Sequence, residues 1–365
     1  MFRTAAALLA AVLFLTQCRA AEAETKRTAP PSLSAVSAIL MDADSGRVLF
    51  AQNADARSRI ASTTKILTGL LVCEQMELGQ EVTVPKEAVG AEGSSMYLTA
   101  GERLTVRELL YGLLLRSGND AAMALAILCD GTAERFAERM NARAAQLGMT
   151  DSHFCNPSGL DEDGHFSTAR DLARLTRAAL RNPLFREAVG TKSVTLGTRA
   201  LTNHNRLLWS YPGANGVKTG YTRAAGRVLV SSASRGGRTL IAVTICDPND
   251  WKDHAALLDY GFSAFEWRCF LRAGENAGSV PVIGGVKDTA VLRTGEALSW
   301  PLAPGETAEL RLHAPQFVFA PVLNGPAGYA ELLVNGEPVR RVTVYYRHPV
   351  AQTTEKGLLR RLLGG

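Results

Sequence analysis

Residues 62–76 read STTKILTGLLVCEQM, a polar tetrapeptide that runs directly into apolar residues at helical spacing. The apolar side chains recur every three or four positions and predict a helix: Ile66, Leu67, Leu70 and Leu71. Residues i and i+3 share one face of a helix, so the Lys65 amine can reach the Ser62 hydroxyl. A serine becomes a strong nucleophile when a base takes its proton, and burial or a second cation lowers a lysine pKa enough to supply that base. The stretch therefore indicates a lysine-activated serine, with an ordinary helix-capping serine as the alternative.

A second polar motif, Ser117-Gly118-Asn119, interrupts an apolar and otherwise helical stretch at residues 104–129. Glycine and polar residues are costly inside a helix unless they serve a function. A break at this point can turn the Ser117 hydroxyl and the Asn119 amide toward a cleft. The alternative is a plain loop between two helices.

A third motif, Lys218-Thr219-Gly220, comes shortly before a predicted strand. Lys218 supplies a second positive charge and Thr219 a hydroxyl for a terminal carboxylate. Gly220 removes a side chain where a substrate backbone needs to come close. Three motifs in this order, the first on a helix and the last beside a strand, indicate a serine acyl-transferring enzyme.

The order of predicted elements indicates an α+β part followed by an all-β part. A hairpin is expected around residues 42–46, helices over 133–147 and 167–181 (capped by Ser167), strands at 227–232 and 238–246, and a last helix at 254–265. Strands from both ends of this part are expected to share one sheet. From about residue 272, short apolar runs alternate with turns such as Asn335-Gly336, which predicts a small sandwich or barrel.

The motifs and their surroundings resemble the penicillin-interacting serine enzymes, with S-x-x-K, S-x-N and K-T-G in order. Over about residues 33–265 the chain resembles the low-molecular-weight D-alanyl-D-alanine carboxypeptidases: GSSMYL (93–98), LLYGLLLRSGNDAA (109–122), NPSGL (156–160), HFSTA (165–169) and GVKTGYT (216–222). The resemblance implies a β-lactamase/transpeptidase-like domain, a helical block plus an antiparallel sheet, followed by a small all-β domain. It also implies removal of the terminal D-alanine from peptidoglycan stem peptides through an acyl-enzyme that β-lactams block.

Carried over by position, the resemblance implies a role for each motif residue. Ser62 would attack the carbonyl between two D-alanines, Lys65 would accept its proton, and Thr219 would bind the terminal carboxylate. Backbone N–H groups of Ser62 and Tyr221 would form the oxyanion hole beside Gly220. The proton relay and the hold on the peptide would fall to Ser117, Asn119 and Lys218.

One departure from the family concerns the substrate carboxylate. Members often carry an arginine between the K-T-G strand region and the last helix, whereas residues 247–253 read DPNDWKD here. Lys252 is the only cation in that stretch, and a solvated charge at a helix start explains it equally well. The basic partner of Thr219 is therefore left open.

The two ends of the chain predict export and membrane contact. Arg3, the apolar run at residues 5–16 and Ala21-Glu22-Ala23 predict a signal peptide over residues 1–23, with lipidation of Cys18 as the alternative. Export would place the protein in the periplasm or on the outer face of the cytoplasmic membrane. Residues 351–365 interleave leucines with basic residues and predict a membrane anchor, the alternative being a frayed tail. Between the ends we expect a linker at 24–34, the peptidase domain at 35–268 and a β-rich domain at 269–350.

Composition argues against other partners and cofactors. The net charge of +5 is spread along the chain, with no basic run of the kind that binds nucleic acid. The five cysteines left after cleavage show no paired spacing, so neither a disulfide framework nor a metal site is expected. The expected partners are a peptidoglycan pentapeptide, β-lactam antibiotics and a membrane surface, with no cofactor.

The sequence fits two other functions less well than that of a carboxypeptidase. A β-lactamase needs a glutamate base before the K-T-G strand; residues 188–217 contain no glutamate, and Glu162 and Glu187 lack the surroundings of such a base. A non-catalytic wall-binding protein would not need both Lys65 and Lys218.

Overall fold

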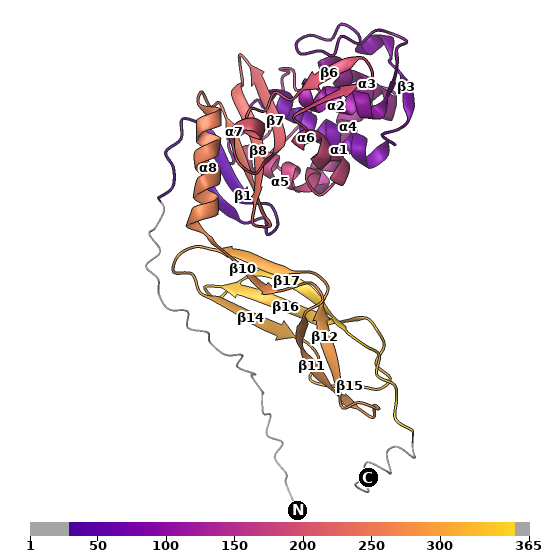
Figure 1. Cartoon of the computed structure of the whole chain (residues 1–365), viewed down its shortest axis with the longest axis vertical. Helices are drawn as coiled ribbons and strands as arrows, with labels where there is room; N and C mark the ends of the chain where they lie inside the picture. Colours follow the sequence, from indigo (N-terminus) through magenta and orange to yellow (C-terminus); the bar gives the residue numbers. More distant parts are fainter. Residues whose placement is uncertain (1–28, 355–365) are drawn as a thin grey trace, which may run out of the picture.

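The computed structural model describes residues 29–354, and it is elongated, with an α+β part at one end and an all-β part at the other (Figure 1). The predicted α+β fold followed by a small all-β domain is confirmed. The predicted signal peptide, residues 24–28 of the predicted linker and residues 355–365 of the predicted anchor lie outside the described residues. Within residues 29–354, no helix has the length and hydropathy of a membrane-spanning segment.

The α+β part is built on a five-stranded antiparallel sheet in the order β2-β1-β9-β8-β7. Its strands are β1 (Ser37–Asp42), β2 (Val48–Gln52), β7 (Ala214–Thr222), β8 (Gly226–Arg235) and β9 (Arg238–Ile245). The first strand lies between β2 and β9, and Ser37 pairs with Ile245. The strands from the two ends of this part thus share one sheet.

Side-chain alternation makes this sheet apolar on both faces. Ile241 and Val243 of β9 face one hydrophobic core, while Leu240 and Ala242 face the other. Strands covered on both sides become continuous apolar runs, which is why RTLIAVTIC shows no polar alternation.

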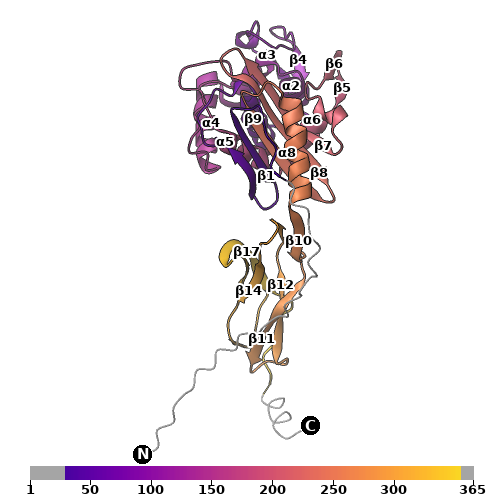
Figure 2. The ribbon, with the colours of Figure 1, turned by 90° about the vertical axis from the view of Figure 1, so that its left-hand side faces the viewer.

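Helices cover the two faces of the sheet (Figures 1 and 2). Helix α8 (Asp250–Ala264) packs on one face, and α5 (Ala169–Ala179) and α6 (Pro183–Gly190) pack on the other. Helix α1 (Lys65–Gln75) lies inside the helical block, and its residues 65–72 are all buried. The remaining elements are α2 (Val106–Leu115), α3 (Asn119–Asp130), α4 (Ala133–Gln146), α7 (Leu207–Ser210), the 3₁₀ turns η1 (Ala61–Thr64) and η2 (Lys86–Ala88), and two small hairpins, β3 (Glu81–Thr83) with β4 (Arg103–Thr105) and β5 (Ser193–Leu196) with β6 (Arg199–Thr202).

Two local features differ from the prediction. The side chain of Thr168, not Ser167, caps α5, because its hydroxyl accepts a hydrogen bond from the Asp171 N–H. The K-T-G motif does not precede a strand but lies within β7, at the edge of the sheet.

The all-β part contains a six-stranded sheet in the order β14-β16-β17-β12-β11-β15 and a separate β10–β13 pair. The strands are β10 (Glu266–Leu271), β11 (Asn276–Ile283), β12 (Thr289–Thr294), β13 (Leu298–Leu302), β14 (Ala308–His313), β15 (Val318–Phe319), β16 (Pro326–Val334) and β17 (Glu337–Tyr346). Asn335 and Gly336 both have positive φ and join β16 to β17, as a two-residue hairpin turn of this composition requires.

Arg47 joins the two parts. It follows the β1–β2 turn and donates hydrogen bonds to the Pro301 carbonyl (2.6 Å) and to both carboxylate oxygens of Glu306 (2.7 and 2.5 Å). Its guanidinium carbon also lies 5.6 Å from the ring centre of Phe265 and 5.8 Å from that of Trp300.

Candidate active site

The lysine of the first motif lies where its amine meets the serine hydroxyl. Ser62 lies in η1 and Lys65 is the first residue of α1, so the helix begins three residues later than predicted. Lys65 is completely buried, and its Nζ lies 2.9 Å from Ser62 Oγ. The same Nζ donates to Asn119 Oδ1 at 2.6 Å and to the Ser158 carbonyl at 2.5 Å.

The surroundings of Lys65 favour its neutral form. Burial holds the pKa of Lys65 well below its usual value, and the nearby Lys218 lowers it further, against a smaller opposing effect of Asp120. No carboxylate among residues 29–354 forms an ion pair with Lys65. A neutral amine has two N–H donors and one lone pair. Asn119 Oδ1 and the Ser158 carbonyl take the donors, which leaves the lone pair for the Ser62 hydroxyl.

The second motif separates α2 from α3 and serves the same amine. Ser117 has a φ of 62°, a left-handed conformation that ends the run of α2, and it lines the cleft. Asn119 begins α3; besides accepting from Lys65, its amide nitrogen donates to the Glu92 carbonyl at 2.5 Å. The interruption is therefore part of the site and not a plain loop.

The neighbouring Asp120 fixes the loop that borders this motif. Its buried carboxylate accepts hydrogen bonds from the Met96 and Leu98 N–H groups and from the Ser95 hydroxyl. These contacts hold residues 95–98 against α3, and Ser94 at the start of the loop lines the cleft.

The third motif faces the first across the cleft. Lys218 is buried on β7, burial lowers its pKa to about 7, and its Nζ donates to the Thr219 carbonyl. Thr219, Gly220 and Tyr221 line the cleft. A Cβ on Gly220 would lie 3.1 Å from the Ile60 oxygen and 3.2 Å from the Ser62 nitrogen. Glycine therefore allows β7 to approach the backbone of the turn that holds Ser62. The expected approach of a substrate backbone at Gly220 stays a prediction.

The loop at residues 156–160 forms the wall behind Lys65. Asn156 Oδ1 accepts from the Ser158 and Gly159 N–H groups, and this turn presents the Ser158 carbonyl to Lys65. Gly159 has a φ of 83°, and a Cβ there would lie only 1.9 Å from the Ala61 oxygen. The loop and η1 are therefore packed backbone against backbone.

His165 stabilises the same wall of the site and does not line the cleft. Its Nδ1 accepts from the Cys155 N–H, so Nε2 carries the proton and donates to Thr64 Oγ1 at 2.8 Å. Burial lowers the pKa of His165 to about 4, which keeps the ring neutral. Thr64 Oγ1 in turn donates to the Ala61 carbonyl, so the histidine braces η1.

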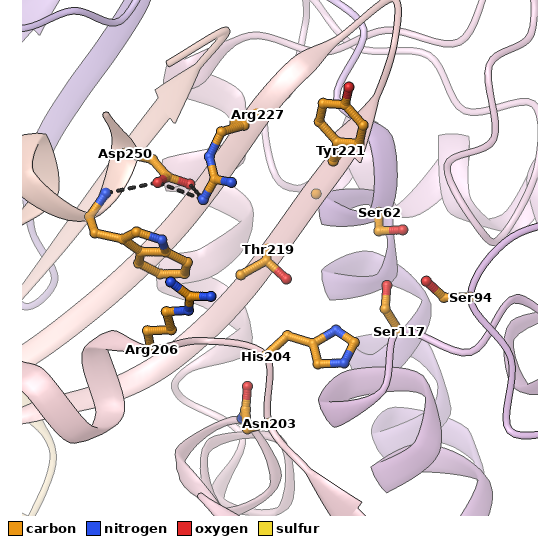
Figure 3. A pocket seen from close by; sticks show the side chains of 12 residues that line it. Ser62, Ser94, Ser117, Asn203, His204, Arg206, Thr219, Tyr221, Arg227 and Asp250 are labelled. Atoms are coloured by element: carbon orange, nitrogen blue, oxygen red, sulfur yellow. Dashed lines mark hydrogen bonds and ion pairs between the residues drawn. The ribbon is translucent and has the colours of Figure 1, made fainter. Parts of the chain in front are cut away.

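The three motifs border one cleft with a cavity volume of about 570 Å³ (Figure 3). Ser62, Ser117 and Thr219 reach it from three different elements. Sequence reasoning missed several of its residues: Ser94, Arg206, Arg227, Asp250 and Trp251.

Two of the missed residues are arginines on the Thr219 side of the cleft. Arg227 of β8 pairs with Tyr221 across the sheet and forms an ion pair with Asp250 at 2.8 Å, and its guanidinium carbon lies 5.7 Å from the ring centre of Trp251. Arg206 is exposed and forms no ion pair within residues 29–354. Lys252, the cation that the sequence offered, is exposed on α8 and does not line the cleft.

Residues 29–354 contain no cluster of three or more His, Cys, Asp or Glu side chains arranged to hold a metal ion.

Comparison with known proteins identifies the family. Residues 24–249 match the D-alanyl-D-alanine carboxypeptidase family. The chain is 35% identical over 321 residues to the D-alanyl-D-alanine carboxypeptidase DacF of Bacillus subtilis (84% of this chain, 82% of that protein) and 36% identical over 352 residues to DacC of Escherichia coli (91% and 88%). Among solved structures, penicillin binding protein 5 of Haemophilus influenzae superposes with a TM-score of 0.75 at 28% identity, covering 89% of this chain and 100% of that one. The chain belongs to the D-alanyl-D-alanine carboxypeptidase family.

Proposed function

We propose that Ser62 is the nucleophile of the D-alanyl-D-alanine carboxypeptidase reaction and that Lys65 is its base. The observation that carries this proposal is the 2.9 Å contact between Lys65 Nζ and Ser62 Oγ, made by an amine that is buried without a carboxylate partner. Such an amine accepts a proton where an ordinary lysine would already be charged.

The positions of these groups support the following reaction. Ser62 Oγ attacks the carbonyl carbon between the two D-alanines while its proton passes to Lys65. The C–N bond then breaks, the proton held by Lys65 passes through Ser117 and Lys218 to the leaving D-alanine amine, and the peptide remains as an ester on Ser62. Water hydrolyses this ester; a β-lactam acylates the same oxygen and stalls at this stage. Asn119 holds Lys65 and the peptide in place.

The backbone N–H groups of Ser62 and Tyr221 are proposed as the oxyanion hole. The tetrahedral intermediate places a negative charge on the former carbonyl oxygen, and two fixed N–H donors stabilise it. The close approach of Gly220, the residue before Tyr221, to the Ser62 nitrogen supports this assignment.

For the substrate carboxylate, we propose Thr219 together with Arg206. Both arginines line the cavity with Thr219, but Asp250 offsets the charge of Arg227. Arg206 is the uncompensated cation, and arginine binds carboxylates through paired N–H donors. Replacing it by alanine should raise KM for a peptide ending in D-Ala-D-Ala about tenfold or more with a smaller change in kcat, whereas Lys252→Ala should leave both unchanged. An unchanged KM in Arg206→Ala would remove Arg206 from this role.

Labelling with a fluorescent penicillin tests the nucleophile. The wild-type chain should form a covalent adduct that Ser62→Ala abolishes, and Ser152→Ala, whose hydroxyl lies outside the cleft, should label normally. Labelling that persists in Ser62→Ala would refute the assignment. Release of D-alanine from a pentapeptide then separates a carboxypeptidase from a protein that only binds penicillin.

We further propose that the chain is exported, that its peptidase domain spans residues 35–268, and that residues 351–365 attach it to the membrane. The signal-like first 23 residues and the alternation of leucine with basic residues near the C-terminus support export and attachment. Deletion of residues 354–365 should move part of the protein from the membrane to the soluble fraction. An unchanged distribution would argue against the anchor.

A further inference from the structure

The end of the all-β part farthest from the cleft carries exposed apolar side chains. Strands β11 and β15 pair in parallel there, with Ile283 opposite Phe319, and both lie at the end of the molecule away from the helices (Figure 1). Ile283 is 48% exposed, Phe317 49%, Phe319 67% and Leu323 72%. The two phenylalanine rings pack edge to face at 5.6 Å, so they form one surface and not scattered contacts. We name these four residues the apolar tip.

Side-chain alternation makes the apolar tip unusual for a surface facing water. Val282, Val318 and Val322 belong to a small internal cluster, whereas their chain neighbours Ile283, Phe319 and Leu323 point outward. A sheet with one face in water normally places polar residues on that face. Here both faces are apolar, and the outer one has no covering element among the described residues. Contiguous exposed apolar surface of this kind marks an interaction site.

The end of the described chain lies beside the apolar tip. The Thr353 N–H donates to the Gly284 carbonyl at 2.8 Å, and Val322 and Val350 exchange backbone hydrogen bonds. The segment that we propose as a membrane anchor therefore continues from the same end of the molecule. Its sequence, EKGLLRRLLGG after residue 354, contains four leucines among three basic residues.

Basic residues lie close to the tip along the sequence. The turn at residues 283–288 and the chain from 347 to 354 contain Lys287 and Arg347 against Asp288, and the sequence from 355 to 365 adds Lys356, Arg360 and Arg361 against Glu355. Exposed aromatic and aliphatic side chains together with lysine and arginine are the combination that binds an interface of anionic lipids. A protein partner would not require this excess of basic over acidic residues.

We infer that the apolar tip inserts into the surface of an anionic lipid bilayer and forms a second membrane contact beside the C-terminal segment. This inference rests on the proposed membrane attachment. With two contacts the molecule stands on the membrane through the end of its all-β part, and the cleft faces away from the lipid. A single flexible attachment would leave that orientation undefined.

Vesicle binding of the full chain tests the inference. The probe is phosphatidylcholine vesicles with about one third phosphatidylglycerol, and the measured quantity is the partition coefficient from flotation. Phe317→Ser/Phe319→Ser should weaken binding about a hundredfold, since each buried aromatic side chain is worth roughly tenfold. Trp209→Ser, which removes an equally exposed aromatic from α7, should leave binding unchanged. Unchanged release of D-alanine from a soluble peptide shows that the variants are folded.

Deletion of residues 354–365 separates this inference from the proposed anchor. If the tip contributes, the deleted chain keeps weak binding that the double substitution then removes. If the deletion abolishes binding and the double substitution has no effect in the full chain, the tip inference fails while the anchor stands. If the wild-type chain does not bind the vesicles, both fail. If the double substitution abolishes self-association without affecting vesicle binding, the occupant is a second copy of the chain and the inference is overturned.

Discussion

Gly159→Ala should disable the site without touching any group that contacts substrate. The added Cβ would lie 1.9 Å from the Ala61 oxygen, whereas a carbon normally stays about 3.3 Å from a carbonyl oxygen, so the loop or η1 must move by about 1.4 Å. Either movement separates the Ser158 carbonyl or Ser62 from Lys65. A displacement of about 1 Å at a reacting group costs on the order of a hundredfold in rate. We expect the rate of acylation to fall by about that factor or more.

Gly164→Ala provides the matched control. Gly164 lies five residues further along the chain and also has a positive φ, 88°, but a Cβ there meets nothing closer than 3.7 Å. Both variants therefore carry the backbone strain of a left-handed alanine, about 1 kcal/mol, and only Gly159→Ala carries the collision. Stopped-flow acylation by a fluorescent penicillin gives the rates, and circular dichroism shows whether each variant is folded. If folded Gly159→Ala acylates as fast as Gly164→Ala, the loop does not set the position of Lys65.

Three further predictions concern charge, domain contact and thiols. The acylation rate should rise with pH as Lys65 loses its proton, at a pH set by its lowered pKa. Lys218→Ala removes a nearby positive charge, so the pKa of Lys65 should rise and this acid limb of the pH profile should move to higher pH. Lys218→Arg keeps the charge and should leave the limb in place. Equal limbs in the two variants would contradict the coupling. Arg47→Ala removes charge-assisted hydrogen bonds worth about 2 kcal/mol between the α+β part and the all-β part. Calorimetry should then show separate unfolding transitions for the two parts. A single unchanged transition would show that this contact does not couple them. Burial raises the thiol pKa of Cys73 and Cys129 to about 12, so at pH 8 a thiol reagent should modify the exposed cysteines first, as peptide mapping would reveal.

The helical part of the site was predictable because its signals are local. The apolar spacing of α1 and the interruption at Ser117-Gly118-Asn119 both follow from residues within a few positions of one another. The exact start of α1 was not, because the 3₁₀ turn at Ser62 is held by His165 and by the approach of Gly220, both far away in sequence. The strand that contains Lys218 was not predictable from local residues either, because threonine and glycine obscure its apolar pattern.

The arginines of the cleft show where sequence reasoning reached its limit. Arg227 reads as an ordinary strand residue, and Asp250 as the first acidic residue of a helix. Only the pairing of β7 with β8 and the start of α8 bring them to the cleft. The family pattern predicts the carboxylate-binding cation between the K-T-G strand region and the last helix, whereas Arg206 precedes that strand.

The strand order of the main sheet also determines when the enzyme can become active during its synthesis. β1 pairs with β9, and the turn that holds Ser62 packs against β7. Residues near the start of the fold therefore cannot reach their final contacts until residues near the end of the sheet have been synthesised. Pairings between such distant segments form slowly, and they cannot form on a chain that is still emerging. A nascent chain that has exposed Ser62 and Lys65 but not yet residues 214–245 has neither Lys218 nor an edge strand opposite the serine. The proposed nucleophile is thus translated early, and its surroundings are complete only when the whole sheet has been synthesised.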